Sequence, residues 1–369
     1  MTSVPVNPPV TEYLYRKATA AGTPLSGTFE LTPVCNMDCK MCYVHANPRE
    51  NLPTAEKWLE LGRKARDAGM LYLLLTGGEP FMYPQFRDVM EGLHRLGLLI
   101  TLNSNGTLID ENVIAWLKKC PPMRVNISLY GASDETYAKL CGNPKGYTQV
   151  TKAIELLQNA GISVKLNCSL TPYNGADLPK MVEFAKEKGL YLQVATYMFP
   201  PMRKDAALVG QNDRFTPEEA AYYMAYADLL TLGPEKFLEK AAPKVPEDGC
   251  AIPDGIRCRA GKCSFWVTWQ GQMTPCGMFP TEGSPNVFET DFSQAWAQVK
   301  EYTASIRLPE KCAGCSVKED CRACGAMVIT ESGCFDKAPR YRCEMMYAYP
   351  AQYDRVKEKI LWERKNSTF

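Results

Sequence analysis

Three cysteines close together in the chain are the residues best suited to chemistry. Cys35, Cys39 and Cys42 lie within one stretch of eight residues. Three thiolates leave one iron of a 4Fe-4S cluster without a protein ligand, and an open coordination site lets another molecule bind the metal directly. A structural zinc site needs four ligands, and His45 is the nearest candidate for the fourth. The spacing therefore predicts an open iron-sulfur cluster, with a closed zinc site as the alternative.

A second group of cysteines lies near the carboxyl end of the chain. Its spacing is Cys-x4-Cys-x12-Cys, then Cys-x2-Cys-x5-Cys-x2-Cys, then one later cysteine. The members are Cys258, Cys263, Cys276, Cys312, Cys315, Cys321, Cys324 and Cys343. Eight thiolates suit two further iron-sulfur clusters, and two zinc sites are the alternative.

The composition favours metal binding over disulfides. The chain has 16 cysteines and two histidines, so the ligands must be mainly thiolates. We expect a cytoplasmic protein, because no signal-peptide core precedes the first strand and no apolar run reaches the roughly 20 residues that cross a bilayer. The 42 Lys and Arg residues balance 41 Asp and Glu residues. This balance predicts no nucleic-acid partner and no membrane contact.

Six short β-rich segments alternate with helical segments and must position these cysteines. The predicted strands are 28–32, 71–76, 98–103, 124–130, 163–170 and 190–197, and the predicted helices between them include 55–68, 83–96, 147–160 and 178–188. Such alternation is typical of a parallel α/β sheet. The three-cysteine loop follows the first strand, at the edge of the sheet where ligands bind in such folds.

Two of the predicted strands carry polar residues on one face only. Parallel strands covered on both faces are normally apolar throughout. The alternating polar residues are Asn126, Ser128 and Tyr130 on one strand and Lys165, Asn167 and Ser169 on the next. This pattern predicts a partial (β/α)6 TIM-like barrel whose inner face borders a polar cavity. Strands half-exposed to solvent are the alternative.

The Cys-x3-Cys-x2-Cys loop resembles that of the radical S-adenosylmethionine (SAM) superfamily. The resemblance implies that Cys35, Cys39 and Cys42 hold a cluster that binds and cleaves SAM. A Gly-Gly-Glu-Pro segment, Gly77, Gly78, Glu79 and Pro80, follows the second strand and is similar to a family motif whose backbone and carboxylate hold the SAM amino group. Further SAM contacts implied by the resemblance are Asn103, Ser104, Asn105, Ser128 and Asn167.

Two positions depart from the family pattern. Met41 stands where the family often has an aromatic residue beside the adenine, and a thioether side chain can also cover a flat ring. Cys141 replaces a basic residue that often neutralises the SAM carboxylate, so Lys165 is the expected substitute. The Cys141 thiol would either pack as a small apolar group or donate a hydrogen atom to a substrate radical.

The carboxyl-terminal cysteines resemble the SPASM extension of radical SAM enzymes. By this resemblance one auxiliary cluster takes Cys258, Cys263, Cys276 and Cys324, and the other takes Cys312, Cys315, Cys321 and Cys343, which makes three 4Fe-4S clusters in all. The interval between Cys321 and Cys324 is one residue shorter than the family usually has between its last two close cysteines. Cys334 is therefore an alternative to Cys324 as the cluster ligand. The expected organisation is an N-terminal extension (1–27), the radical SAM partial barrel (28–197), a helical linker (198–250), the SPASM domain (251–350) and a C-terminal helix (351–369).

The two resemblances together imply an enzyme that uses a 5'-deoxyadenosyl radical to modify a ribosomally synthesised peptide. The expected product is a thioether or carbon-carbon crosslink, or an epimerised residue. The alternatives are a sulfatase-maturing, formylglycine-generating enzyme and a maturase of a peptide-derived cofactor. Gly277 argues against the sulfatase reading, because those relatives usually carry Asp directly after this cysteine. A non-catalytic iron-sulfur electron carrier is the distant alternative.

The same resemblance implies the partners. They are a precursor peptide and a reductant such as flavodoxin or ferredoxin. Only 27 residues precede the first predicted strand, too few for a winged-helix leader-binding domain, so leader recognition is expected from a separate protein or from the core itself.

Overall fold

One curved sheet of eight strands forms the centre of the computed structural model, which describes residues 9–44, 52–201, 213–239 and 255–366. The strand order is β6-β5-β4-β3-β2-β1-β7-β8. Their bounds are β1 Ser26–Glu30, β2 Tyr72–Thr76, β3 Leu99–Ser104, β4 Arg124–Ser128, β5 Val164–Ser169, β6 Leu192–Ala195, β7 Ser264–Val267 and β8 Met273–Thr274. The six predicted strands are therefore confirmed, each within a few residues of its expected ends.

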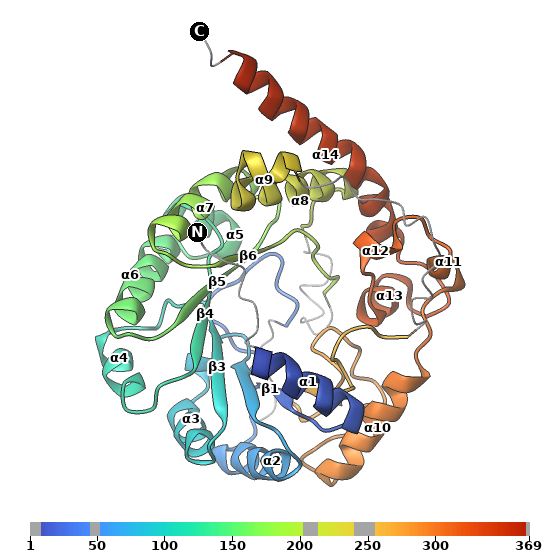
Figure 1. Cartoon of the computed structure of the whole chain (residues 1–369). Coiled ribbons are helices and arrows are strands. Elements are labelled where there is room, and N and C mark those ends of the chain that lie inside the picture. The colour runs from blue at the N-terminus through green and yellow to red at the C-terminus, as the bar shows by residue number, and fades with distance from the viewer. Residues whose placement is uncertain (1–8, 45–51, 202–212, 240–254, 367–369) are drawn as a thin grey trace.

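Helices cover the outer face of the sheet, and the inner face stays open to the barrel interior (Figure 1). The covering helices are α2 Ala55–Asp67, α3 Phe86–Arg95, α4 Glu111–Leu117, α5 Asp134–Cys141, α6 Gly146–Asn159 and α7 Leu178–Glu187. Between the sheet and these helices lies the main apolar core, in which Phe29 of β1 meets Trp58 of α2 with ring centroids 5.3 Å apart. In each strand with alternating polar and apolar residues, the apolar side chains face the helices and form this core. This arrangement is the one that the partial-barrel prediction requires.

A hairpin near the carboxyl end extends the same sheet. Strand β7 pairs with β8 in antiparallel fashion, and it also pairs with β1 in parallel, with Ser26 opposite Ser264. The hairpin is thus continuous with the barrel sheet. A sequence pattern cannot show this pairing, because more than 200 residues separate the two strands.

Helices α1, α4 and α5 were among those not predicted. Helix α1, Pro9–Ala21, lies in the predicted N-terminal extension, and α4 and α5 lie between the third and fifth strands. The Ser133 hydroxyl caps α5 by accepting a hydrogen bond from Thr136 N at 3.2 Å. Gly142 ends the same helix with φ of 68°, a left-handed conformation that glycine adopts easily.

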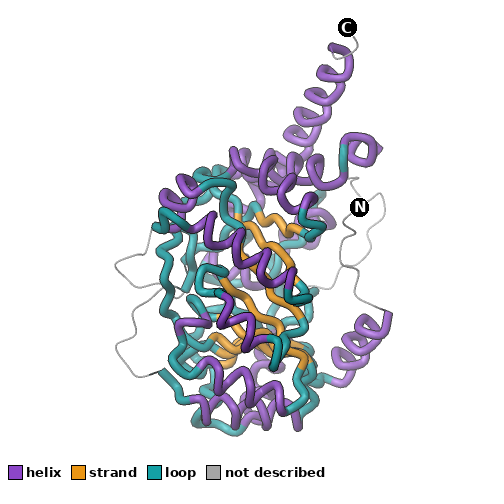
Figure 2. The backbone as a smooth tube through the Cα atoms, turned by 90° about the vertical axis from the view of Figure 1, so that its left-hand side faces the viewer, coloured by secondary structure: helices purple, strands orange, loops and turns teal. Residues whose placement is uncertain are grey.

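The carboxyl-terminal part is helical and packs beside the open end of the sheet. It contains α8 Pro217–Leu232, which begins with a capping box of Thr216 and Glu219, α9 Pro234–Glu239, α10 Phe292–Ser305, α11 Glu310–Ala313, α12 Lys318–Cys321, α13 Gly325–Ser332 and α14 Arg340–Asn366. Helix α14 crosses the boundary expected at residue 350. It packs along α8, and its last turns project from the body of the protein (Figure 2). Within the described ranges, no helix has both the length and the apolar character needed to cross a membrane.

Candidate functional site

The three-cysteine loop follows β1 and is held by the end of α5. Asp38 N donates to Cys141 O at 2.9 Å, and Lys40 N donates to Leu140 O at 3.0 Å. Within the loop, Cys42 N donates to Cys39 O at 2.9 Å. These backbone bonds fix the loop without using its side chains, so the three thiols can face the barrel. His45, the candidate zinc ligand, lies outside the described residues.

A cavity of about 370 Å³ opens between this loop and the carboxyl ends of the strands. Its lining comprises the loop residues Cys35, Met37, Cys39, Met41, Cys42, Tyr43 and Val44, the strand-end residues Thr76, Gly77, Gly78, Asn103, Ser104, Asn105, Asn126, Ser128, Tyr130, Asn167, Ser169 and Ala195, and Tyr197, Met198, Phe199 and Met278. We call this space the upper cavity. It brings together the three cysteines, Met41, the two glycines and all five predicted asparagine and serine contacts. None of the described residues that line it carries a formal charge at neutral pH, apart from the thiols when ionised.

The two glycines bring the chain after β2 against the chain after β1. Gly78 N donates to Thr32 O at 2.6 Å, and Glu79 N donates to Val34 O at 2.8 Å. A Cβ atom at Gly77 would lie 2.5 Å from Thr32 O, and one at Gly78 would lie 2.4 Å from Val34 O. Any side chain would break this contact, so glycine is required to form the cavity wall.

Glu79 departs from the expected direct contact with SAM. Its carboxylate is fully buried and does not line the upper cavity. It accepts hydrogen bonds from Asn105 N at 2.7 Å, Ser104 Oγ at 2.9 Å and Phe81 N at 3.3 Å. Burial raises the pKa of this carboxyl to about 7. Glu79 therefore orders the chain after β3, and Pro80 begins the short helix η1, Pro80–Met82, behind it.

Asn167 supplies the clearest sign that the upper cavity is built for a ligand. Its Oδ1 atom is buried and has no hydrogen-bond partner among the described residues. A buried amide without a partner costs free energy unless a ligand supplies one. Ser128 and Ser169 lie on the same wall. These neutral groups suit the amino, carboxylate and hydroxyl groups of SAM, and Cys35, Cys39 and Cys42 suit an iron-sulfur cluster beside it.

The Cys35 thiol needs a metal in order to ionise at neutral pH. Burial, with smaller contributions from Glu79 and the neighbouring thiols, raises the pKa of Cys35 to about 12. A thiol with this pKa stays protonated at neutral pH, whereas an iron ligand must be a thiolate. Cluster assembly would therefore release protons from this loop.

Lys165 and Cys141 do not reach the upper cavity. Lys165 donates to Gln193 Oε1 and lies lower along β5 than Asn167. The Cys141 side chain is fully buried in the main core. Its position favours the packing role over hydrogen donation, and Lys165 is not placed to neutralise a carboxylate in this cavity.

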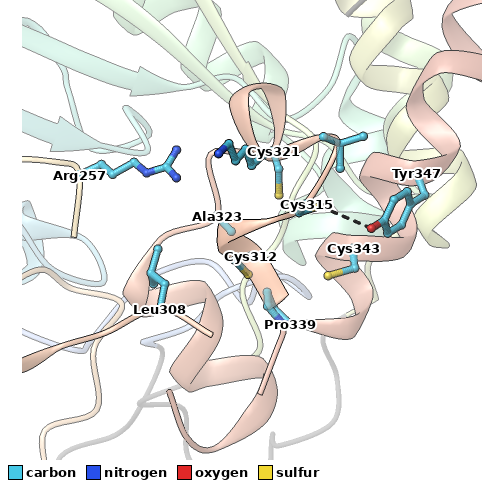
Figure 3. Close-up of a pocket in the computed structure, with 11 residues that line it drawn as sticks. Arg257, Leu308, Cys312, Cys315, Cys321, Ala323, Pro339, Cys343 and Tyr347 are labelled. Carbon is cyan, nitrogen blue, oxygen red and sulfur yellow. Dashed lines mark hydrogen bonds between the residues drawn. The ribbon is translucent and has the colours of Figure 1, made fainter. Parts of the chain in front are cut away.

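The second auxiliary set is gathered around one small cavity (Figure 3). Cys312, Cys315, Cys321 and Cys343 all line a space of about 30 Å³ between α11, α12 and the start of α14. Burial and the three neighbouring thiols raise the pKa of Cys343 to about 11. Arg342 Nε donates to Cys321 O at 3.1 Å and ties α14 to this loop. Four thiols and little free space fit a closed cluster.

The first auxiliary set is only partly gathered. Cys276 and Cys324 pack in one apolar cluster with Ile256 and Phe279, and a Cys258 charge contributes to raising the pKa of Cys324. Cys263 instead faces α1, where its Sγ lies 3.1 Å from Thr19 Oγ1. The four thiols predicted for this cluster therefore do not share one apolar cluster, because Cys263 packs with Ala18 and Leu25 whereas Cys276 packs with Ile256 and Phe279.

Cys334 does not take the place of Cys324. It lies in the loop after α13, where its thiol donates to Ser332 O at 3.6 Å and a hydrogen bond with Asp336 raises its pKa. In the described part of the chain, no three His, Cys, Asp or Glu side chains are arranged to hold a single metal ion. The cluster sites therefore rest on the grouping of the thiols along shared cavities.

A partly buried ion pair, which no sequence motif indicates, joins the start of α8 to α13. Arg214, just before α8, pairs with Glu331 of α13, and its guanidinium stacks 3.7 Å from the centre of the Tyr341 ring. Tyr197, which lines the upper cavity, donates to Glu331 Oε1 at 2.8 Å. Residues so distant in sequence carry no common motif, so only the fold reveals them.

Part of the chain matches a known protein family. Residues 29–185 match the family model of the Radical SAM superfamily. An AdoMet-dependent heme synthase of Methanosarcina barkeri is 25% identical over 330 residues, which cover 83% of this chain and 92% of the relative. The Bacillus subtilis protein AlbA, of antilisterial bacteriocin subtilosin biosynthesis, is 27% identical over 73% of this chain and 58% of its own length.

Solved structures share the fold. Streptococcus suis SuiB bound to S-adenosylmethionine aligns with a TM-score of 0.65 and 21% identity over 92% of this chain and 82% of SuiB. SuiB bound to its precursor peptide SuiA aligns with the same TM-score and 19% identity over 92% of this chain and 80% of SuiB.

Proposed function

We propose that this chain, a radical SAM enzyme, modifies a ribosomally synthesised peptide held inside its barrel. The observation that carries the proposal is the upper cavity, where the three-thiol loop, the glycine pair and the unsatisfied Asn167 amide face one space. An open cluster site beside an unfilled polar cavity is what a cluster-bound cosubstrate requires.

The residues of the chain have distinct tasks in this proposal. Cys35, Cys39 and Cys42 hold the cluster, and the backbone at Gly77 and Gly78 and the side chains of Ser128 and Asn167 bind SAM, with Met41 beside the adenine. When bound, the cluster and SAM supply a 5'-deoxyadenosyl radical that removes a substrate hydrogen atom. The chain positions the target C–H bond and excludes other hydrogen donors.

The relatives support a peptide as the substrate class. AlbA takes part in making a bacteriocin, and SuiB was solved with a precursor peptide. Gly277 disfavours the sulfatase-maturing alternative, since a Cβ atom there would lie 2.8 Å from Trp266 Cε2 and an aspartate would displace the indole ring. We expect a thioether or carbon-carbon crosslink or an epimerisation as the product.

The auxiliary thiols support further clusters. Cys312, Cys315, Cys321 and Cys343 hold a closed cluster in this proposal, and Cys258, Cys276 and Cys324 contribute to a third. Three 4Fe-4S clusters require about 12 irons per chain, and two require about 8. Flavodoxin or ferredoxin would supply electrons, a separate leader-binding protein would present the peptide, and the many reduced thiols suit the cytoplasm.

The test is formation of 5'-deoxyadenosine by the purified, reduced protein under strict anoxia. We expect SAM cleavage that increases when the cognate precursor peptide is added, with a mass change of two hydrogens for a crosslink and none for an epimer. No 5'-deoxyadenosine would favour the electron-carrier alternative. Cleavage stimulated by a tetrapyrrole and not by any peptide would assign the chain to the chemistry of its heme synthase relatives.

A further inference from the structure

A second cavity lies at the amino ends of the strands, at the opposite end of the barrel from the upper cavity. It has a volume of about 630 Å³, and Thr11 and Tyr15 of α1 form part of its wall. We call this space the lower cavity. Asn126 of β4 lines both cavities, and its Nδ2 atom donates to Asn103 Oδ1 in the upper one at 2.8 Å. The two spaces are therefore neighbours along the same strand.

Positive charge gathers in the lower cavity. Arg124 and Arg259 line it, and none of the described lining residues is acidic. Arg259 is already paired, because it donates to Glu12 Oε2 at 3.0 Å and stacks 3.6 Å from the centre of the Tyr15 ring. Arg124 has no carboxylate partner among the described residues, and its Nε atom donates only to the neutral Asn126 Oδ1 at 3.0 Å.

A lysine on the next strand adds to the positive charge near the lower cavity. Lys165 lies opposite Asn126 in the pairing of β4 with β5, and it bonds to the neutral side chain of Gln193. Burial and the nearby Arg124 lower the pKa of Lys165. Two cations held together in a half-buried interior repel each other and favour an anionic ligand.

The strand geometry sets the distance between this charge and the reaction site. Arg124 and Ser128 face the same interior and are four residues apart on β4, which corresponds to about 13 Å. An extended peptide rises by a similar amount per residue, so about four residues would span the gap. A group anchored at Arg124 would thus hold a residue several positions away against the upper cavity.

We propose that Arg124, supported by Lys165, anchors a carboxylate of the peptide substrate about four residues from the residue that is attacked. This inference rests on the proposed function, because it assigns the substrate class of the same barrel. A guanidinium binds a carboxylate through two parallel hydrogen bonds, which gives orientation as well as affinity. The anchor would place the target residue in register with the cosubstrate.

The experiment compares two acetylated, amidated peptides, Gly-Gly-Gly-Asp and Gly-Gly-Gly-Asn, binding to the reconstituted, SAM-loaded protein in isothermal titration calorimetry. We expect the wild type to bind the Asp peptide about tenfold more tightly, since a charged hydrogen-bond pair is lost in the Asn peptide. Arg124→Gln should abolish the preference. Arg63→Gln, at an exposed arginine of α2, should keep it.

Equal binding of the two peptides by the wild type, no measurable binding of the Asp peptide, or a preference that survives Arg124→Gln would overturn the anchor. Iron content and peptide-free SAM cleavage should be the same in Arg124→Gln as in the wild type, which shows that the variant is folded. The binding readout does not depend on SAM cleavage. If the protein cleaves SAM but does not prefer the Asp peptide, only the anchor proposal is refuted. If it prefers the Asp peptide but cleaves no SAM, only the proposed function is refuted.

Discussion

Two thiol sites in this chain differ in the space around them. The loop of Cys35, Cys39 and Cys42 borders a cavity of about 370 Å³, whereas the four thiols around Cys315 enclose about 30 Å³. The first site offers three ligands and room for a further molecule. The second offers four ligands and almost no room. In the proposed function, this difference separates a site where a cosubstrate can reach the metal from one that can only store or pass electrons.

Loss of a thiol at the open site should have the largest effect on activity. Cys39→Ala leaves two ligands for the cluster, and we expect SAM cleavage to fall by at least about 1,000-fold. Formation of 5'-deoxyadenosine measures the change. Cys120→Ala removes a buried thiol that lines neither cavity and should retain cleavage within a few-fold. Similar losses in both variants would mean that the open site has no special role.

Loss of a thiol at the closed site should remove iron without stopping SAM cleavage. Cys315→Ala removes one of four ligands, so we expect about four fewer irons per chain and peptide-free cleavage within about threefold of the wild type. Iron analysis and 5'-deoxyadenosine assays measure the two effects. Cys334 belongs to the same region but does not line the cavity formed by the four thiols. The matched variant Cys334→Ala should therefore keep all its iron. Complete loss of cleavage in Cys315→Ala would contradict the division of roles.

The ion pair between Arg214 and Glu331 should contribute to stability. Glu331→Gln leaves the partly buried Arg214 without a charged partner, and we expect a decrease of about 3 kcal/mol in the free energy of unfolding. Glu344→Gln breaks the exposed pair with Arg340 and should cost less than about 0.5 kcal/mol. Chemical denaturation under anoxia compares the two. Equal changes would show that the Arg214 pair is no stronger than a surface pair.

The buried carboxyl behind the open site should make stability depend on pH. The pKa of Glu79 is about 7 in the folded chain, against an ordinary value of 4.5, so folding favours its protonated form. The contribution of the protonated Glu79 carboxyl to the free energy of unfolding is complete below pH 4.5. This contribution, up to about 3 kcal/mol, is lost as the pH rises through 7. Unfolding of the wild type and of Glu79→Gln between pH 5 and 8 measures this. The wild type should lose stability with rising pH more steeply, and parallel curves would contradict the assignment.

Local patterns were sufficient to predict much of this molecule. The cysteine spacing predicted both thiol sites, because ligands of one cluster lie close in sequence. The alternation on β4 and β5 predicted a polar interior, because side chains alternate between the two faces of a strand. Gly77 and Gly78 were identified by motif, and their close approach to the chain after β1 gives the physical reason for glycine.

Contacts between distant segments could not be predicted. Glu79 turns toward the end of β3 and away from the cavity, which depends on the packing of two strands. Cys263 faces α1, a helix that the sequence pattern did not reveal, so spacing alone grouped it with Cys276. Arg124 gains its significance from a cavity whose described lining residues include no carboxylate, which depends on several strands at once.

The most direct test of the open site is electron paramagnetic resonance of the reduced protein with and without SAM. A variant with alanine at Cys312, Cys315, Cys321 and Cys343 should keep a cluster signal that changes when SAM is added. A variant with alanine at Cys35, Cys39 and Cys42 should keep auxiliary iron whose signal does not respond to SAM. A SAM-dependent change in the second variant, or none in the first, would contradict the assignment of SAM to the upper cavity.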